Sequence, residues 1–184
     1  VDDVNEMSLR NLWPIDFEMY AEYVGFPCFM KPAFGGGWKD VNKCNNLDDI
    51  MRHYQASGQK TMMLQQAMTW DIYIRIPTIG RKHVRAIRYD PAPGGLGGYN
   101  QDYDAIPSNV RDEAEELSLR FNKALGYDMN AIELAYKDGR YYGIDLTNYT
   151  PDLDYRSLKD AHFPWAVEKM ATFAIEKALS KEPT

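Results

Sequence analysis

A chain of 184 residues, 45% of them hydrophobic, is long enough to bury a core, which excludes a disordered protein and leaves one domain or two small lobes. The net charge of −6 excludes nucleic acid and an anionic membrane as main partners, because both are bound through concentrated Lys and Arg. A few local cations can still hold a small anionic ligand.

Two cysteines, Cys28 and Cys44, lack the spacing of a metal site, and Cys28 lies in an apolar run, where a structural thiol is expected. We therefore predict a reducing compartment, the cytoplasm. No stretch is apolar for long enough to span a bilayer, and no signal-like segment opens the chain. The first residue is Val rather than Met, and we expect an upstream part of the same protein.

The first predicted helix and strand lie between residues 16 and 31. Asp16 is a good N-cap, and apolar side chains come after it at helical spacing, at Phe17, Tyr20, Ala21 and Val24. Residues 26–30 are short, aromatic and bounded by Gly25 and Pro32, which favours a buried strand. Lys31 then stands at the end of this strand.

Three glycines, Gly35, Gly36 and Gly37, lie between Lys31 and Lys39. Glycines adopt positive φ and let backbone N–H groups approach a ligand closely, and such groups bind anionic oxygens. A strand-end lysine with this loop favours a polyphosphate site, although the G-x-x-x-x-G-K-[ST] spacing of the P-loop is absent. A hairpin tip with solvated lysines explains these residues equally well when they are taken alone.

The chain then completes a small α+β lobe. Residues 40–43 are predicted to return as a strand, Asn46 to cap a helix that ends at Ser57 and Gly58, and residues 62–66 to form another strand. The apolar stripe of this helix is Leu47, Ile50, Met51 and Tyr54.

Isoleucine alternates with polar residues along the next run, which reads Asp71, Ile72, Tyr73, Ile74, Arg75 and Ile76. This alternation predicts buried isoleucines and a polar face directed at a cleft or at water. Arg75 shares the Asp71 face and is a candidate site residue. Gly80 turns the chain into a strand on which Val84, Ala86 and Arg88 share one face.

Residues 91–104 are predicted to form a loop, because 91–98 holds two prolines and four glycines and the remainder is polar. Ser108 opens a longer helix that Gly126 ends. The tail has Pro164 near a helix start and then an apolar stripe of Val167, Met170, Ala174 and Ala178.

Two carboxylates lie in a predicted hairpin around the turn at residues 137–140. A two-residue Asp-Gly turn pairs Glu133 with Ile144 and sends Asp145 to the opposite face. A three-residue loop pairs Glu133 with Gly143 and directs both carboxylates to one side. We predict the three-residue loop, because it also gives a common apolar face of Ile132, Leu134, Ile144 and Leu146.

Glu133, Asp145 and the amide oxygen of Asn148 form a set of hard oxygen ligands suited to Mg²⁺, which keeps several waters and shares phosphate oxygens. Acids on a hairpin are more often solvated surface. The metal interpretation therefore depends on the cationic loop beside Lys31.

The run from residue 24 to 37, with Phe29-Met30-Lys31-Pro32-Ala33 ahead of three glycines, resembles the ATP-grasp fold, especially glutathione-synthetase-like and ribosomal-S6-modification-type ligases. The order of the later elements is similar too: a helix, a strand with a hinge at residues 64–68, an acid, a strand, a helix and the acidic hairpin. The resemblance covers residues 16–154. It implies an α+β fold of two lobes, residues 1–67 and 68–184, with ATP between them.

The resemblance implies that the first lobe binds the nucleotide. Lys31 would contact the ATP phosphates, and Gly35, Gly36 and Gly37 would fold over them. The implied contacts to adenine and ribose are Phe29, Leu64, Gln66, Ala67, Met68, Asp71 and Ile144. Backbone groups of the hinge would meet adenine, and Asp71 would accept hydrogen bonds from ribose.

The resemblance also implies the metal site and the reaction. Glu133, Asp145 and Asn148 would hold Mg²⁺, although the family's Glu-x-Asn is here Asp145-Leu146-Thr147-Asn148, so either Thr147 or Asn148 is the third ligand. Arg88, together with Lys31, would be catalytic and would steady an acyl phosphate. The implied activity is an ATP-dependent carboxylate–amine ligase that forms an amide.

Other functions of the same residues stay open. A kinase-like or carboxylase-like member of the fold would use the same ATP site, and a non-catalytic nucleotide-binding module would bind without turnover. The implied partners of a ligase are a small-molecule or peptide carboxylate and an amine. The substrate domain would lie upstream of Val1.

Overall fold

The computed structural model describes residues 15–36, 38–91, 98–148 and 150–180, so Gly37 and residues 92–97 of the predicted loop lie outside it. The chain divides into two compact units, the first extending to Thr69 and the second beginning at Trp70. Both have helices packed on antiparallel sheets, which confirms the predicted α+β class.

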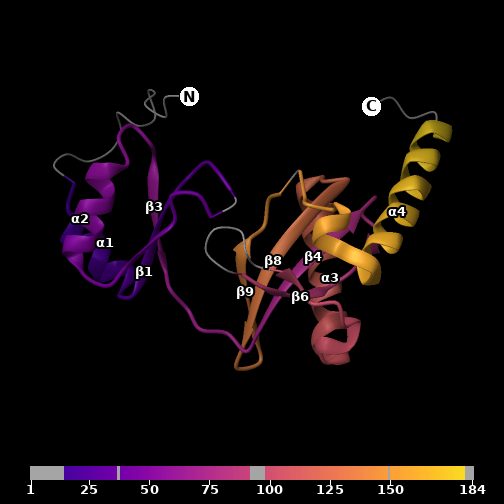
Figure 1. Ribbon diagram of the computed structural model, residues 1–184, viewed down its shortest axis with the longest axis horizontal. Helices are drawn as coiled ribbons and strands as arrows, with labels where there is room; N and C mark the ends of the chain where they lie inside the picture. The colour runs from indigo at the N-terminus through magenta and orange to yellow at the C-terminus, as the bar shows by residue number, and fades with distance from the viewer. Residues whose placement is uncertain (1–14, 37, 92–97, 149, 181–184) are drawn as a thin grey trace. The chain divides into compact units, whose positions relative to one another are not determined.

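The first unit is a three-stranded sheet with two helices on one face (Figure 1). In chain order it contains α1 (Phe17–Val24), β1 (Cys28–Pro32), β2 (Asn42–Cys44), α2 (Leu47–Ala56) and β3 (Met62–Gln66). The strand order is β2-β1-β3, and the core holds Ala21, Cys28, Met30, Cys44 and Ile50. Because strand residues alternate between faces, Phe29 and Lys31 face away from the helices.

Side-chain caps start both helices of this unit, as the sequence predicts. Asp16 and Asn46 each accept a hydrogen bond from the backbone N–H three residues later, at 2.9 Å. The first two strands begin later than predicted. Pro27 has no N–H for the β1 ladder, and Asp40, with a φ of 60°, belongs to the turn before β2.

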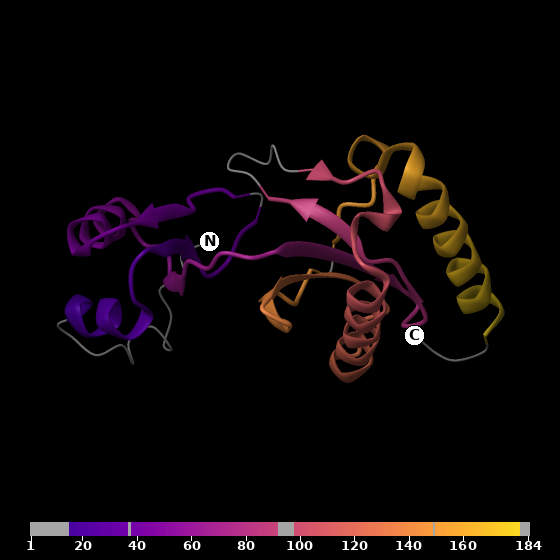
Figure 2. The same cartoon turned by 90° about the horizontal axis from the view of Figure 1, so that it is seen from below.

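The second unit is a larger sheet with α3 and α4 on opposite sides (Figure 2). Its elements are β4 (Ile72–Ile79), β5 (His83–Val84), β6 (Ile87–Asp90), β7 (Gly98–Tyr99), η3 (Tyr103–Ala105), α3 (Ser108–Leu125), β8 (Met129–Lys137), β9 (Arg140–Asp145) and α4 (Tyr155–Leu179). The order is β7-β6-β4-β8-β9, with β5 also paired to β4. None of the helices in the described ranges is long and apolar enough to cross a lipid bilayer.

Each face of this sheet has its own core. The α3 face buries the predicted isoleucines of β4, Ile74 and Ile76, against Ile132 and Leu134 of β8 and Val110 of α3. The α4 face buries Ile87, Tyr99, Leu158 and Ala166. The predicted alternation along β4 is therefore confirmed. Arg75 lies opposite Ile87, which places Arg75 and Tyr73 on the α4 face.

The region predicted as a single loop, residues 91–104, contains a short strand and a 3-10 turn where the structure describes it. Tyr99 of β7 pairs with Tyr89 of β6, and the two ring centroids are 5.2 Å apart. Tyr99 is only 7% exposed. The loop prediction is wrong here. A strand of two residues is too short to give a periodic pattern in the sequence, and β7 is stabilised by the packing of Tyr99 on Tyr89 of β6.

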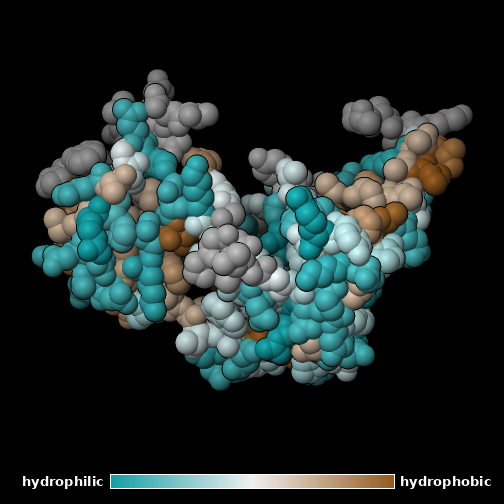
Figure 3. Space-filling model, in the orientation of Figure 1, coloured by the Kyte–Doolittle hydropathy of each residue, from teal (hydrophilic) through white to brown (hydrophobic). Residues whose placement is uncertain are grey.

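Helix α4 differs from the prediction in its start and in its buried side. It begins at Tyr155 and kinks at Lys159, whose φ is 50°, so Pro164 lies near the start of the second helical segment, which begins after the kink. Its buried residues are Leu158, His162 and Ala166. Val167 of the predicted stripe is 51% exposed, and hydrophobic residues reach the surface towards the end of α4 (Figure 3).

His162 fixes the first turns of α4 to the sheet. The ring is fully buried, its Nδ1 accepts a hydrogen bond from Arg85 Nε at 3.0 Å, and its Nε2 lies 2.7 Å from the carbonyl oxygen of Asn100. These contacts require a neutral ring that carries its proton on Nε2. Burial, and then the Arg85 charge, lower the pKa of His162.

We expect the free energy of unfolding to fall as the pH drops below about 6.5, the ordinary histidine pKa. Below that value the unfolded chain binds a proton that folded His162 does not, so the contribution of His162 is present above about pH 6.5 and is lost below it. Urea unfolding of wild type and His162→Gln between about pH 7.5 and 5.5 measures the difference. Parallel curves for the two proteins would contradict this prediction.

Candidate functional site

The outward face of the first unit's sheet combines an aromatic ring with lysines. Phe29 lies directly opposite Lys43 on β2 and Gln65 on β3, and Lys31 lies two residues along the same strand face. The Trp38 ring meets Phe29 edge to face, with centroids 6.2 Å apart. In the described part of the unit, neither lysine has an ion-pair partner. This face can therefore accept an anion beside a flat ring.

The glycine loop leaves its backbone open. Gly35 has a φ of 146°, and a side chain added at Gly35 or Gly36 would meet no atom within 4 Å. The glycines are therefore not required by packing inside the unit, and at Gly35 the backbone conformation itself favours glycine. Gly37 lies outside the described residues. At the base of the loop, Lys60 Nζ contacts the Asp40 carboxylate at 2.5 Å.

The predicted adenine contacts are distributed over both faces of this sheet. Leu64 lies opposite Met30 and packs into the helix-side core, whereas Phe29 faces away from the helices. Leu64 and Phe29, both implied as adenine contacts, therefore lie on opposite faces of this sheet. The N–H of Ala67 already donates to the Pro27 carbonyl at 3.0 Å. Gln66 is exposed and Met68 half-buried, so the other hinge groups are accessible.

An arginine and a glutamate are paired on the α4 face of the second unit. Arg75 lies opposite Glu133 on neighbouring strands, with Nη1 3.0 Å from Oε1. The side chains are only 13% and 17% exposed. The Tyr73 hydroxyl donates to the other oxygen, Oε2, at 2.5 Å. Burial, and then the Glu133 charge, raise the pKa of Tyr73, which keeps this phenol a donor.

Aromatic and amide groups complete the surroundings of this arginine. The Arg75 guanidinium carbon lies 5.5 Å from the ring centroid of Tyr89 and 5.7 Å from that of Tyr99. In the amide orientation that satisfies both of its polar groups, Asn148 accepts from Arg75 Nη2 at 3.1 Å. Asn130, which is fully buried, accepts from the Asn148 backbone N–H at 2.7 Å and so fixes its place.

The hairpin brings Glu133 and Asp145 together by a different route from the predicted one. The turn has two residues, Asp138 and Gly139, both with positive φ, and not three. A register shift between Glu133 and Leu134 leaves Ile144 as an extra residue, so Glu133 lies directly opposite Asp145. The predicted pairing of Glu133 with Gly143 is wrong, but the two carboxylates still share one side.

The donor chemistry of this set fits a divalent cation. Glu133 and Asp145 offer carboxylate oxygens, and Asn148 offers an amide oxygen. Asp145 is exposed, and one of its oxygens accepts from the Thr147 N–H at 3.3 Å. Over the described ranges, no group of three or more His, Cys, Asp or Glu side chains is placed to hold a metal. A metal here would thus rest on two acids, one of them already paired with Arg75.

Three predicted site residues lie apart from this group. Arg88 is opposite Ile74, on the α3 face, so it does not join Glu133 and Asp145 as its catalytic role requires. Asp71 directly precedes the first residue of β4, and its carboxylate accepts a hydrogen bond from the Asp138 N–H at 3.2 Å. Ile144 is the extra residue of the bulge and lies outside the apolar core that contains Leu134 and Leu146.

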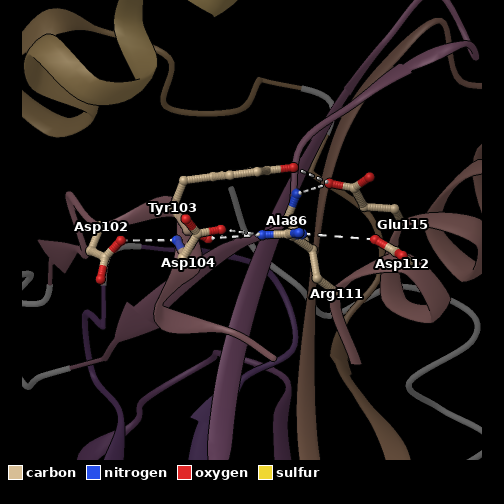
Figure 4. A network of polar contacts seen from close by, with 7 residues as sticks. All are labelled: Ala86, Asp102, Tyr103, Asp104, Arg111, Asp112 and Glu115. Atoms are coloured by element: carbon tan, nitrogen blue, oxygen red, sulfur yellow. Dashed lines mark hydrogen bonds and ion pairs between the residues drawn. The ribbon is translucent and has the colours of Figure 1, made fainter. Parts of the chain in front are cut away.

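A second polar network lies against α3 (Figure 4). Glu115 accepts from the Ala86 N–H at 2.8 Å, and Arg111 lies 3.0 Å from the Asp104 carboxylate. The Tyr103 ring is 4.3 Å from Arg85 and 4.4 Å from Arg111, measured from each guanidinium carbon to the ring centroid. These groups satisfy one another, so the network joins η3 to α3 and offers no open ligand position.

The sequence did not reveal every residue of the candidate site. Tyr73 lies two residues before Arg75 in the same strand, so the period of two predicts that both side chains share one face. Lys43 could be placed beside Phe29 only from the register of β1 with β2. Tyr99 needed a strand that no pattern indicates, and its position next to Arg75 comes from packing.

The class of fold is clear from these units together with comparisons of known proteins. No family model matches the chain. Solved structures of ligases and carboxylases match the chain over most of its length. The fold is the ATP-grasp fold that these enzymes share. The predicted fold is therefore confirmed.

Particular relatives are similar at low identity. D-alanine–D-alanine ligase from Bacillus anthracis, solved with ATP, aligns at a TM-score of 0.64 and 18% identity, over 97% of this chain and 57% of that one. The biotin carboxylase domain of Hydrogenobacter thermophilus 2-oxoglutarate carboxylase, solved with MgADP and bicarbonate, gives 0.57 and 16%, over 84% and 38%. Pyruvate carboxylase 1 of Caenorhabditis elegans is 21% identical over 69% of this chain. The chain spans 12% of that carboxylase.

Proposed function

We propose that this chain is the ATP-binding part of an ATP- and Mg²⁺-dependent carboxylate–amine ligase. The observation that carries the proposal is the outward face of the first unit, where Phe29, Lys31 and Lys43 stand together next to an open glycine loop on an ATP-grasp fold. The ring suits a flat base, and the two lysines, which have no ion-pair partner among the described residues, suit a polyphosphate.

The proposed chemistry has two steps. A substrate carboxylate oxygen attacks the γ-phosphorus of ATP, and ADP leaves; an amine then attacks the acyl carbon, phosphate leaves, and the amine loses a proton. Lys31 and the N–H groups of Gly35 and Gly36 neutralise phosphate charge as it develops. Glu133, Asp145 and Asn148 would hold Mg²⁺, which supplies Lewis-acid polarisation of phosphate oxygens when bound.

Replacing Lys31 with Ala is expected to weaken Mg-ATP binding at least tenfold, about 1.4 kcal/mol. The lysine loses no ion pair within the described protein, so the change removes a ligand contact without breaking an internal one. Titration calorimetry of wild type, Lys31→Ala and Lys82→Ala measures it. Lys82 pairs with Glu176 on the surface of the second unit and should leave binding unchanged. Equal binding by wild type and Lys31→Ala would remove Lys31 from the site.

A carboxylase is the second candidate, because the curated relatives include pyruvate, acetyl-CoA and 2-oxoglutarate carboxylases. The same ATP site would then activate bicarbonate in place of an organic acid. Measuring which co-substrates are required for phosphate release from ATP distinguishes the ligase from the carboxylase. Dependence on a carboxylate together with an amine supports the ligase, and dependence on bicarbonate supports the carboxylase. Nucleotide binding without release under either condition supports a non-catalytic module.

The identity of the substrates and the context of the chain belong to the same proposal. The relatives are several times longer than this chain, which supports a separate substrate domain in the whole protein. Cys28 and Cys44 are both free and buried, although they lie opposite each other on β1 and β2. We place the protein in the cytoplasm, where such thiols are kept reduced.

A further inference from the structure

Two of the three predicted metal ligands contact a positive charge that belongs to the protein. The Arg75 guanidinium contacts Glu133 at 3.0 Å and Asn148 at 3.1 Å, and Glu133 lies directly opposite Asp145. Arg75 therefore already engages two of the three predicted ligands, Glu133 through an ion pair and Asn148 through a hydrogen bond. The Tyr73 hydroxyl donates to the remaining oxygen of Glu133.

The guanidinium is held too firmly to act as a loose surface charge. Its side chain is 13% exposed, and its carbon lies 5.5 Å and 5.7 Å from the ring centroids of Tyr89 and Tyr99. Its neighbours lie on three different strands, β6, β7 and β8. Moving Arg75 away would leave Glu133 buried without its counter-ion, which is costly. The guanidinium therefore keeps its place when a cation approaches.

The formal charge of the group decides how strongly it attracts a cation. Glu133, Asp145 and Arg75 together carry one negative charge, whereas the two carboxylates alone would carry two. Attraction between a divalent ion and its ligands scales with this charge, and burial reduces the screening by water. Each carboxylate oxygen still has a second lone pair, so Glu133 can bind a metal while it is paired with Arg75.

We propose that Arg75 is a resident cation that sets the divalent-metal affinity of this site by compensating Glu133. Asp145 then carries the net charge that attracts the metal. The inference rests on the proposed function for the identity of the ligand, Mg²⁺ with a nucleotide. It names Arg75 as an affinity-determining residue that contacts Glu133 and Asn148.

Mn²⁺ binding, measured by electron paramagnetic resonance with and without a non-hydrolysable ATP analogue, tests the inference. Arg75→Gln is neutral but still donates to Glu133, and it should bind Mn²⁺ at least about tenfold more tightly than wild type. Arg75→Lys keeps the charge and should stay within about threefold. The matched control is Arg81→Gln, which removes the same charge from a surface pair with Asp128 at 2.9 Å and should change nothing.

A second neutral variant keeps the test decisive if Arg75→Gln does not fold, as judged by circular dichroism. Arg75→Met also removes the charge while both carboxylates stay, so it should bind Mn²⁺ at least about tenfold more tightly than wild type. Unchanged or weaker binding by a folded neutral variant would overturn the inference. Loss of the proposed function would appear separately, as wild type that binds Mn²⁺ but no nucleotide.

Discussion

Replacing Glu133 with Ala is expected to lower the free energy of unfolding of the second unit by about 3–5 kcal/mol. The change leaves the Arg75 guanidinium largely enclosed by protein with no carboxylate counter-ion, and it also removes the acceptor of the Tyr73 hydroxyl. Urea unfolding gives the magnitude. Native-state hydrogen exchange of the β8 amides assigns the loss to this unit and not to the first.

Two comparisons separate the cost of an unpaired buried charge from the loss of any ion pair. Glu176→Ala breaks the surface pair with Lys82, whose partners are nearly half exposed, and should cost less than about 1 kcal/mol. Arg75→Met/Glu133→Leu removes both charges and should recover most of the stability lost by Glu133→Ala. If Glu133→Ala cost no more than Glu176→Ala, Arg75 would be solvated and the enclosed ion pair would not exist as described.

The expected cost bears on function, since Glu133 is at once a predicted metal ligand and the counter-ion of a buried arginine. A loss of activity in Glu133 variants would not by itself identify a metal ligand. Asp145 is exposed and has no ion-pair partner in the described ranges, so Asp145→Asn is the cleaner test of metal binding. The two carboxylates look equivalent in sequence, but the structure gives them different tasks.

Local signals predict the elements that depend on local chemistry. Asp16 and Asn46 cap α1 and α2, β3 spans the predicted residues 62–66, and α3 runs from Ser108 to the left-handed Gly126. The helix ends are set by hydrogen bonds or backbone preferences within a few residues, so their prediction requires no knowledge of the partner strands. The bounds of β3 follow from its short apolar run, although its hydrogen bonds are made to β1.

Features that depend on pairing between strands are less accessible. The Asp138-Gly139 turn is one of the two alternatives that the sequence allows, but the extra residue at Ile144 that brings Asp145 opposite Glu133 has no sequence signal. The role of Arg88 rests on its order in the chain, whereas its face is decided by its pairing with Ile74. The sequence thus predicts the two acids that the structure brings together and names Arg75 as a site candidate, but it does not place Arg75 against Glu133.

Replacing Ile132 with Ala is expected to lower the free energy of unfolding by about 2–5 kcal/mol. Ile132 is fully buried, faces Ile76 on β4 and packs in the core beneath α3, so the deletion leaves a cavity lined by rigid neighbours. Ile175 on α4 is 60% exposed, and Ile175→Ala, the same chemical change, should alter stability by less than about 0.5 kcal/mol. Equal effects of the two substitutions in urea unfolding would mean that the α3 face does not form the core of the unit.

The same variant tests whether the acidic group depends on the core behind it. Ile132 is adjacent in sequence to Glu133 but points to the opposite face of β8, because successive strand residues alternate between faces. Arg75 and Tyr73 hold Glu133 from its own face, and Asn148 contacts Arg75, so a loosened core should leave the group in place. We therefore expect Mn²⁺ binding by Ile132→Ala to stay close to the wild-type value under conditions where the variant remains folded. A large loss of Mn²⁺ binding would show that the packing of the α3 face, and not only the contacts around Arg75, positions the carboxylates.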